Sequence, residues 1–265
     1  IDFKSEEDAM RKFKLANKLS PFMTAMFANS PIRGGVDTGY KTFRGLSWIN
    51  TDNDRCGFAG KISEEFSFDE YIDCIMKTPM IFIQRDVGSV ELHGDITFEE
   101  FMRVGYMGEY PTIEDYELQA NLYFPEVRMR NFIEIRNHDC VSGDLKYAIL
   151  AIYKGIFYDN IAMDECEDLL KHLQYKDLSE LRYNVPKLAL QANIKNNKVA
   201  DYAKEIINIA EKSLKNSQTG EELFLQPLKD LTFKGLSPAD IIQKKWNSTW
   251  NKDLGKMIKY LNSLE

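Results

Sequence analysis

The chain has 265 residues, 44% of them hydrophobic and 28% charged, and these shares are ordinary for a globular protein with one large domain or two small ones. Its formal net charge is −7, which argues against nucleic acid as the main partner because phosphate binding requires a basic surface. No apolar run approaches the roughly 18 residues of a membrane span, and no basic stretch followed by an apolar one marks secretion. We therefore expect neither nucleic-acid nor membrane binding.

The cysteines and histidines argue against a zinc site. The four cysteines are scattered without CxxC spacing and there are only three histidines. Dispersed cysteines without a disulfide framework favour a reducing compartment, so we expect a cytoplasmic protein. The chain starts at Ile1 and Ser5 follows as the N-cap of a helix. This start is typical of the middle of a protein, and we expect a preceding segment or a partner chain to complete it.

Residues 1–140 mix predicted helices and strands. A first helix is expected over residues 5–28 with a bend near Pro21, and the strand-like residues 40–49 follow a turn-rich loop. The next elements are a helix over 68–76, a hairpin around Gly88 formed by 80–85 and 90–93, a helix from Thr97 to Met102, and a helix from Thr112 to Tyr123 with Asp115 at its third position. Residues 126–136 are predicted to form one β-strand.

From Leu145 onward the pattern is almost wholly helical. The expected helices cover residues 145–157, 161–172, 177–183, 197–215, 237–247 and 251–263, with breaks at Pro186, at 217–220 and at Ser237-Pro238. The chain is thus predicted to be α+β. Residues 1–140 would form the sheet-containing part, and residues 141–265 a helical C-terminal region of the same domain.

The predicted strand over 126–136 carries the most informative pattern. Alternate side chains of a strand share a face, so the apolar residues point one way and the charged ones the other. The charged face carries Arg128, Arg130, Glu134 and Arg136. A carboxylate and a guanidinium two residues apart could hold a metal ion and a phosphate side by side, as phosphoryl transfer requires. The alternative is a cross-strand salt bridge on a solvated sheet face.

A second polar cluster covers residues 40–48. As a strand, this segment would place Tyr40, Arg44 and Trp48 on one face. An arginine flanked by aromatic rings suits a carboxylate or phosphate, because its planar fork binds two oxygens and stacks. The alternative is an arginine whose stem covers core aromatics while its head stays in water.

Three further segments have weaker signals. The acidic loop from Thr51 to Arg55 has some resemblance to a calcium loop, but an Asx-turn is favoured. The basic, Asn-rich residues 184–198 precede a long helix and could meet an anion there, with a solvated loop as the alternative. His138 could act as a base, yet no partner is placed beside it.

Six segments, in order along the chain, are similar to motifs of a known family. They are Phe27-Ala-Asn-Ser-Pro31, Gly39-Tyr-Lys-Thr-Phe-Arg44 through Trp48, Thr51-Asp-Asn-Asp-Arg-Cys-Gly57, Gly108-Glu-Tyr-Pro-Thr112, Phe124-Pro-Glu-Val-Arg128 and Ile133-Glu-Ile-Arg136. Essentially the whole chain resembles the C-terminal portion of the plant-type (type 2) glutamate–cysteine ligases. The resemblance implies a glutamine-synthetase-like fold whose antiparallel sheet lines the active site. It also implies ATP and Mg²⁺, with phosphorylation of the γ-carboxylate of glutamate and attack of the cysteine amine on the acyl phosphate.

The same resemblance implies where the glutamate substrate binds. Arg44 would hold it, and Asn29, Tyr40 and Trp48, which belong to the same matched segments, are the further candidates for substrate binding. An arginine in this role agrees with its suitability for carboxylates.

It also implies a metal and nucleotide side of the site. Glu134 would be a Mg²⁺ ligand, and Arg136 would contact the transferring phosphate as the catalytic residue. Lys187 and Lys195 are the candidates for nucleotide contacts, although Gln191 and Lys195 stand where relatives often carry lysine and arginine.

The chain departs from the family pattern in two ways, and the first leaves an alternative function open. The strands that supply the other metal-binding glutamates in the family precede the part that this chain resembles. A non-catalytic glutamate-binding subunit, or a pseudoenzyme that complements another chain, is therefore the rival interpretation. Disulfide control is not expected, because His93 takes the place of one cysteine of the plant hairpin and no cysteine lies near Tyr106.

Overall fold

The computed structural model describes residues 1–86, 88–92 and 96–264. Within these ranges the protein has twelve α-helices and five two-stranded sheets, of which four are antiparallel and one is parallel. The mixed, helix-rich class expected from the sequence is confirmed. The glutamine-synthetase-like arrangement of a larger sheet stays a prediction.

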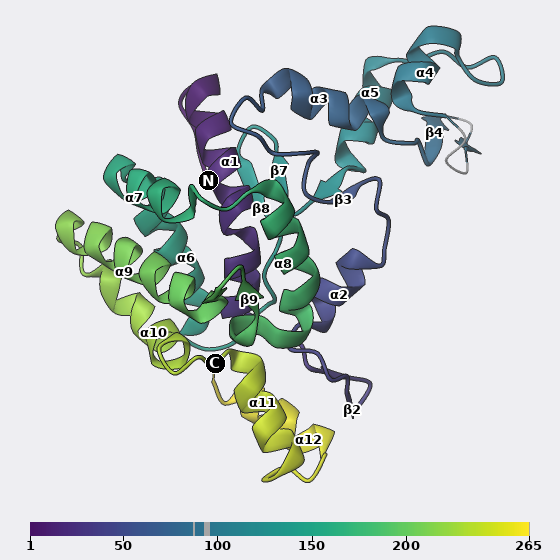
Figure 1. Ribbon diagram of the computed structural model, residues 1–265. Coiled ribbons are helices and arrows are strands. Elements are labelled where there is room, and N and C mark those ends of the chain that lie inside the picture. The colour runs from purple at the N-terminus through teal and green to yellow at the C-terminus, as the bar shows by residue number, and fades with distance from the viewer. Residues whose placement is uncertain (87, 93–95, 265) are drawn as a thin grey trace.

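Helix α1 (Glu6–Met26) is the central element of the fold. The Ser5 hydroxyl accepts the N–H of Asp8, as expected for its N-cap. The helix continues through Pro21, and Phe13 and Phe22 are fully buried. Figure 1 shows α1 in the middle of the molecule, with α8 on one side and α6 on the other.

The C-terminal helices surround α1 and share one hydrophobic core with it. They and the short elements between them are α6 (Leu145–Phe157), α7 (Asn160–Leu170), α8 (Tyr175–Leu188), η1 (Ala189–Gln191), β9 (Asn193–Ile194), β10 (Asn197–Lys198), α9 (Val199–Ser217), η2 (Glu221–Leu225) and α10 (Gln226–Thr232). A methyl group on Gly155 of α6 would lie 2.6 Å from the carbonyl oxygen of Ala210, so only glycine permits α6 and α9 to approach this closely. The expected break at Pro186 is wrong, because α8 runs through it to Leu188.

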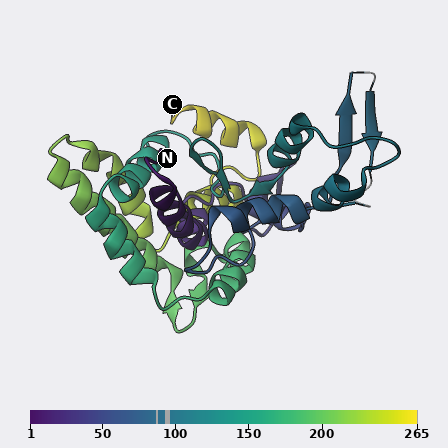
Figure 2. The same cartoon turned by 90° about the horizontal axis from the view of Figure 1, so that it is seen from above.

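A smaller lobe extends from this body, and Figure 2 shows its hairpin projecting at the edge. It contains α3 (Phe68–Lys77), β4 (Phe82–Arg85), β5 (Gly88–Glu91), α4 (Phe98–Val104) and α5 (Ile113–Asn121). Thr97 and Thr112 both start their helices with capping boxes, which confirms the predicted helix starts. A separate core that includes Phe98 and Phe101 holds the lobe together. His93, the predicted end of the hairpin, lies outside the described residues.

The segment 40–49 is not the predicted strand. It forms helix α2 (Phe43–Ile49), whose N-cap Thr42 accepts the N–H of Gly45 at 2.9 Å. The backbone N–H groups of Lys41 and Thr42 donate to the carbonyl of Pro186, which ties the start of α2 to the end of α8. This tertiary contact and the cap override the strand-like composition. Helical spacing places Arg44 and Trp48 on one face.

The segment 126–136 is also not one strand. It forms a hairpin of β7 (Val127–Met129) and β8 (Ile133–Ile135), in which Arg128 lies directly opposite Glu134. A hydrogen bond of 2.8 Å from Arg130 N to Phe132 O closes the turn. The predicted division into faces holds within each strand, because Val127 and Ile133 are buried in the main core.

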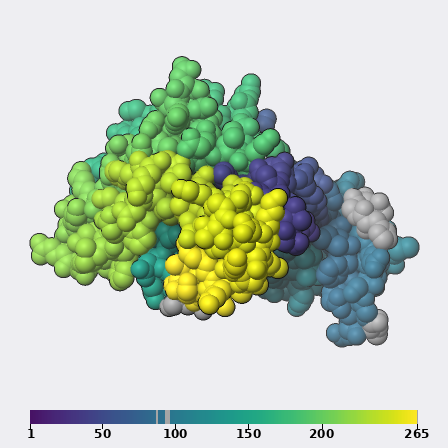
Figure 3. Space-filling model, turned by 90° about the horizontal axis from the view of Figure 1, so that it is seen from below, coloured from purple at the N-terminus to yellow at the C-terminus, as the bar shows by residue number. Residues whose placement is uncertain are grey.

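Four short strands and two helices complete the described chain. They are β1 (Ile32–Arg33), β2 (Val36–Asp37), β3 (Cys56–Gly57), β6 (Phe124–Pro125), α11 (Pro238–Asn247) and α12 (Leu254–Asn262). Trp246 and Trp250 form a small core for the last two helices, which lie together on the face shown in Figure 3. Of the helices in the described ranges, none is both long and apolar enough to cross a membrane.

Candidate functional site

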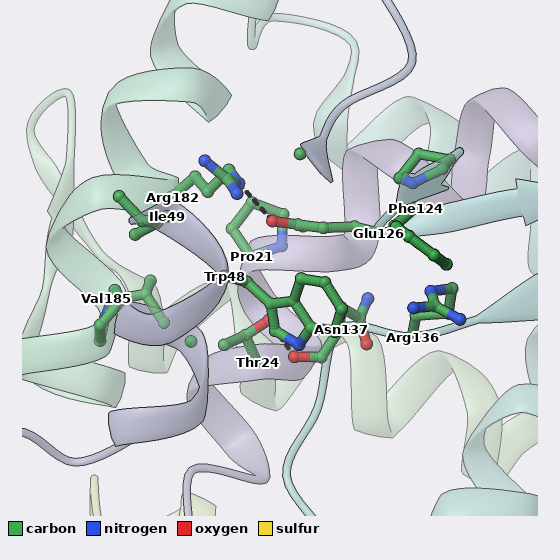
Figure 4. A pocket seen from close by; sticks show the side chains of 14 residues that line it. Pro21, Thr24, Trp48, Ile49, Phe124, Glu126, Arg136, Asn137, Arg182 and Val185 are labelled. Atoms are coloured by element: carbon green, nitrogen blue, oxygen red, sulfur yellow. Dashed lines mark hydrogen bonds and ion pairs between the residues drawn. The ribbon is translucent and has the colours of Figure 1, made fainter. Parts of the chain in front are cut away.

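A small cavity lies where α1, α2, α8 and the strands β3 and β6 meet (Figure 4). Its lining includes Trp48 of α2, Phe124 of β6, Arg182 of α8, and Arg136 and Asn137 just after β8. The volume of about 20 Å³ holds roughly one water molecule. The cavity is therefore nearly closed in this conformation, and its walls are aromatic and cationic.

Arg136 lies between two aromatic rings at the edge of this cavity. Its guanidinium carbon is 5.4 Å from the ring centroid of Trp48 and 5.4 Å from that of Phe124. Cation–π contacts of this kind hold the guanidinium plane in one orientation. Its Nη1 atom is 3.4 Å from Glu134 Oε1. The sequence predicted an arginine flanked by aromatic rings at position 44. In the structure, the arginine that lies between two aromatic rings is Arg136.

Arg44 lies one helical turn before Trp48 and contacts Arg136 behind the cavity wall, because Arg44 itself is not among the lining residues. Its Nη2 donates to the carbonyl oxygen of Arg136 at 2.7 Å, and its guanidinium carbon is 5.8 Å from the Trp48 ring. Its Nη1 is buried and has no hydrogen-bond partner among the described residues. Burial lowers the pKa of Arg44, and the charge of Asp139 opposes that shift. A buried guanidinium with an unmet donor is suited to an anionic ligand.

Glu134 is surrounded by three arginines. Its Oε2 is 2.6 Å from Arg128 Nε and 3.8 Å from Arg130 Nε, and its Oε1 faces Arg136. Burial disfavours the charged form of Glu134, but the hydrogen bond and charge of Arg128, followed by the other two arginines, hold the pKa of the carboxyl below its usual range. The cross-strand ion pair offered by the sequence as an alternative is present. The role of Glu134 as a metal ligand stays a prediction.

The residues around Glu134 suit phosphate better than a metal ion alone. In the part of the chain that the structure describes, no group of three or more His, Cys, Asp or Glu side chains could hold a metal ion. Magnesium commonly takes one or two protein carboxylates and completes its shell with water and phosphate oxygens. Glu134 can therefore supply one oxygen ligand, while the neighbouring arginines match phosphate oxygens.

An ion pair between Glu126 and Arg182 forms one wall of the cavity. The Glu126 carboxylate accepts a hydrogen bond from Arg182 Nε (Figure 4) and another from the hydroxyl of Ser20. A Cβ atom on Gly57, whose φ is +108°, would lie 3.3 Å from the Arg182 guanidinium carbon. Sequence reasoning missed this wall: Glu126 lay inside a recognised motif, but nothing local marked Arg182 as its partner.

Asn29 and Tyr40 do not line the cavity. The side-chain amide of Asn29 donates to the carbonyl of Cys140 at 2.8 Å, and its backbone N–H donates to the buried Asp139 at 2.6 Å. Asn29 thus fixes the loop after β8. The carbonyl of Tyr40 accepts a hydrogen bond of 3.4 Å from Gln243. Their roles in substrate binding stay predictions.

The two predicted nucleotide-binding lysines also lie outside the cavity lining. Lys187 is exposed near the end of α8. Lys195 forms an ion pair of 3.0 Å with Asp177 and donates to the carbonyl of His172 at 2.6 Å. Lys195 is therefore already engaged in holding the β9–β10 turn against the start of α8.

The loop from Thr51 to Gly57 has a structural role. The Asp54 N–H donates to Asp52 Oδ1 at 3.0 Å, which confirms the predicted Asx-turn. Arg55 is 5% exposed and all three of its donor nitrogens are used: with Asp52 at 2.6 Å, the Leu122 carbonyl at 3.2 Å and the Pro79 carbonyl at 2.7 Å.

His138 packs against Phe27 and Tyr153, with ring centroids 5.7 and 6.0 Å apart. Burial lowers the pKa of His138. The histidine does not line the cavity, so the geometry gives no support to a role as base there.

Comparison with known proteins agrees with the motifs. Residues 1–259 match the family model described as Glutamate-cysteine ligase family 2 (GCS2). The chain is 30% identical over 266 aligned residues to glutamate–cysteine ligase B, chloroplastic, of Oryza sativa subsp. japonica, covering 98% of this chain and 53% of the rice protein. It is 29% identical over 265 residues to the chloroplastic glutamate–cysteine ligase of Nicotiana tabacum, covering 98% of this chain and 51% of the tobacco protein. It spans about half the length of these curated relatives.

Proposed function

We propose that this chain, which belongs to glutamate–cysteine ligase family 2, forms part of an ATP-dependent enzyme that joins the γ-carboxylate of glutamate to the amine of cysteine. This would be the first step of glutathione-type thiol synthesis. One observation carries the proposal: Arg44 and Arg136, which are 92 positions apart, meet beside Trp48, and Arg136 and Trp48 line the cavity. Both arginines lie in segments that match the family's motifs.

Arg44 and Arg136 have different roles in the proposed reaction. Arg44 offers a buried, unmet donor and binds a carboxylate of glutamate. Arg136 faces Glu134 and neutralises the charge that develops during phosphoryl transfer. Trp48 and Phe124 keep Arg136 in a fixed plane, so the guanidinium does not have to reorient during the reaction.

ATP with Mg²⁺, when bound, would supply the phosphoryl group that converts the γ-carboxylate into an acyl phosphate. Glu134 would hold the metal through one oxygen, beside Arg136 on the phosphate side. Further carboxylates would come from a part of the protein outside these 265 residues. We also infer that the short β7–β8 hairpin belongs to the larger antiparallel sheet of a glutamine-synthetase-like fold.

The test is cysteine-dependent release of ADP. The protein would be incubated with glutamate, cysteine, ATP and Mg²⁺, both as this chain and with any residues that precede it in the protein as it is made. We expect activity in the longer form, and a sharp loss of turnover when Glu134→Gln removes one ligand charge. Absence of cysteine-dependent ADP from both forms would rule out the ligase.

A second candidate function is a non-catalytic subunit that binds glutamate and completes the site of another chain. One observation favours it for these 265 residues by themselves: in the described ranges, Glu134 belongs to no group of three potential metal ligands. Glutamate binding by calorimetry, together with ADP release only after a partner is added, would support this candidate over a self-sufficient ligase.

A further inference from the structure

Asn137 is a buried residue of the cavity lining with an unmet donor. It lines the cavity, it is only 5% exposed, and its Nδ2 has no hydrogen-bond partner among the described residues. Figure 4 shows its amide beside the Trp48 ring. Buried amide donors in folded proteins are nearly always paired, so an unpaired one at a cavity wall indicates a place for a ligand.

The surroundings of Asn137 hold the amide in this orientation. The Tyr153 hydroxyl donates to Asn137 Oδ1 at 3.4 Å, and the Thr24 hydroxyl donates to the Asn137 carbonyl at 3.2 Å. Burial raises the pKa of Tyr153, so its hydroxyl stays protonated and remains a donor. The acceptor end of the amide is therefore occupied, and the donor end is left for the cavity.

Arg44 reaches the same point of the backbone. Its Nη2 donates to the carbonyl of Arg136, which belongs to the peptide bond that leads into Asn137. Arg44 and Asn137 thus meet the same peptide bond, and each has one donor, Nη1 and Nδ2, without a partner among the described residues. A carboxylate has two oxygens and accepts two such hydrogen bonds.

We propose that Asn137 is a substrate-binding residue whose Nδ2 donates to the α-carboxylate of glutamate, beside Arg44. This inference rests on the proposed function. The γ-carboxylate is the group that reacts, and it must lie toward Arg136 and Glu134. The α-carboxylate then meets Asn137, with Arg44 beside it, and Pro21 and Val185 are apolar parts of the same cavity wall.

The first experiment measures the kinetics of Asn137→Ala in the protein as it is made, with any flanking residues. Loss of a hydrogen bond to a charged group should raise the KM for glutamate roughly ten- to a hundredfold with a smaller change in kcat. The decisive readout is the ratio of kcat/KM for glutamate to that for 4-aminobutyrate, which lacks the α-carboxylate. This ratio should fall by the same factor, whereas a merely structural defect would affect both substrates equally.

Asn17→Ala is the matched control. Asn17 is 2% exposed, its Oδ1 is also unpaired, and it does not line this cavity. Its replacement likewise removes a buried amide. The ratio of the two substrates should remain that of the unmodified protein.

Asn137→Asp tests which end of the amide meets the substrate, and its near-identical shape keeps the test valid if the alanine variant does not fold. A carboxylate at this position would repel the α-carboxylate, so the KM for glutamate should rise further than in Asn137→Ala. Binding of glutamate as tight as in the unmodified protein would overturn the proposal, because the residue would then be acting as an acceptor. An unchanged substrate ratio in Asn137→Ala would overturn it as well.

Failure of this inference can be distinguished from failure of the proposed function by calorimetric titration with glutamate alone. Turnover in the unmodified protein with an unchanged ratio in Asn137→Ala removes only the role of Asn137. If the unmodified protein binds glutamate without turnover and Asn137→Ala loses that binding, the ligase activity is rejected and the role of Asn137 is supported. If the unmodified protein shows neither glutamate binding nor turnover, both the ligase activity and the role of Asn137 are rejected.

Discussion

Two pairs of arginines in this protein differ in what their donors contact. Arg55 and Arg128 are 5% and 7% exposed, and their guanidinium groups hold carboxylates and backbone carbonyls of the protein itself. Arg44 and Arg136 both lie over Trp48, and the side-chain hydrogen bonds found for them are fewer: Arg44 donates to the Arg136 carbonyl, and Arg136 to Glu134. Arg44 also has one buried nitrogen, Nη1, without a hydrogen-bond partner in the described part of the chain.

All four arginines lie in segments that match the same family, so the motifs do not separate structural from functional ones. The hydrogen-bond partners do. A guanidinium with several hydrogen bonds to the protein stabilises the fold, whereas one with few such bonds has capacity for a ligand. The comparison therefore predicts opposite effects of the same substitution at the two kinds of position.

The largest effect is expected from Arg136→Ala. Loss of a guanidinium at a phosphoryl-transfer site should lower kcat by roughly a thousandfold. Thermal unfolding should change little, because the stacked side chain has few hydrogen bonds to the protein. Arg136→Lys should recover only part of the rate, since lysine lacks the planar fork. Steady-state ADP release measures the turnover of both variants. Unaltered turnover would contradict a role of Arg136 in phosphoryl transfer.

The reverse pattern is expected from Arg55→Ala. The substitution leaves two carbonyls and the Asp52 carboxylate without their partner. We expect the free energy of unfolding to fall by about 3 kcal/mol, as measured by urea denaturation. Folded molecules should retain their glutamate KM. A stable variant with weakened glutamate binding would show that Arg55 contributes to binding and not to stability.

A smaller effect is expected from Arg44→Ala, and it should appear in binding. The KM for glutamate should rise about ten- to a hundredfold because a charged hydrogen bond to the carboxylate is lost. The KM for ATP should stay close to that of the unmodified protein. Initial rates over a matrix of glutamate and ATP concentrations separate the two constants, and an unaltered glutamate KM would contradict the assigned role.

The smallest effect concerns pH and Glu134. The pKa of this carboxyl is lowered in the folded protein, so its ion pairs stabilise the fold above the ordinary glutamate pKa of about 4.3. That stabilisation is lost as the pH falls through the lowered pKa. Glu134→Gln should therefore reduce the free energy of unfolding by roughly 1 kcal/mol or less near pH 7, and the difference should vanish in acid. Equal differences at both pH values would contradict this assignment.

Local patterns predicted much of this fold and part of the site. The caps at Ser5, Thr97 and Thr112 mark helix starts that the structure confirms, because capping depends on residues only three positions apart. The helical character of the chain after Leu145 is also confirmed, because the helical pattern depends on residues only three or four positions apart. Local patterns also singled out Arg44 and Arg136, which contact one another in the structure, while their roles stay predictions.

Sequence reasoning failed where distant segments decide the outcome. Residues 40–49 have strand-like composition, but the Thr42 cap and the contact with Pro186 make them helical. The turn after Met129 divides the predicted strand and brings Arg128 opposite Glu134. Arg182 meets Glu126 only because α8 packs against α1, and no spacing along the chain encodes that pairing.

The closed state of the cavity has a consequence for affinity. A space of about 20 Å³ is far below the roughly 300 Å³ of ordinary ligand pockets. If glutamate binds here as proposed, it requires conformations in which Trp48 or the Arg182–Glu126 pair has moved aside. The observed Kd is then the intrinsic Kd divided by the fraction of such open molecules, and an open fraction of about 1% weakens binding about a hundredfold. Observed association rates should therefore level off at high glutamate concentration in stopped-flow measurements. The affinity for glutamate depends as much on the walls that close the cavity as on the donors inside it.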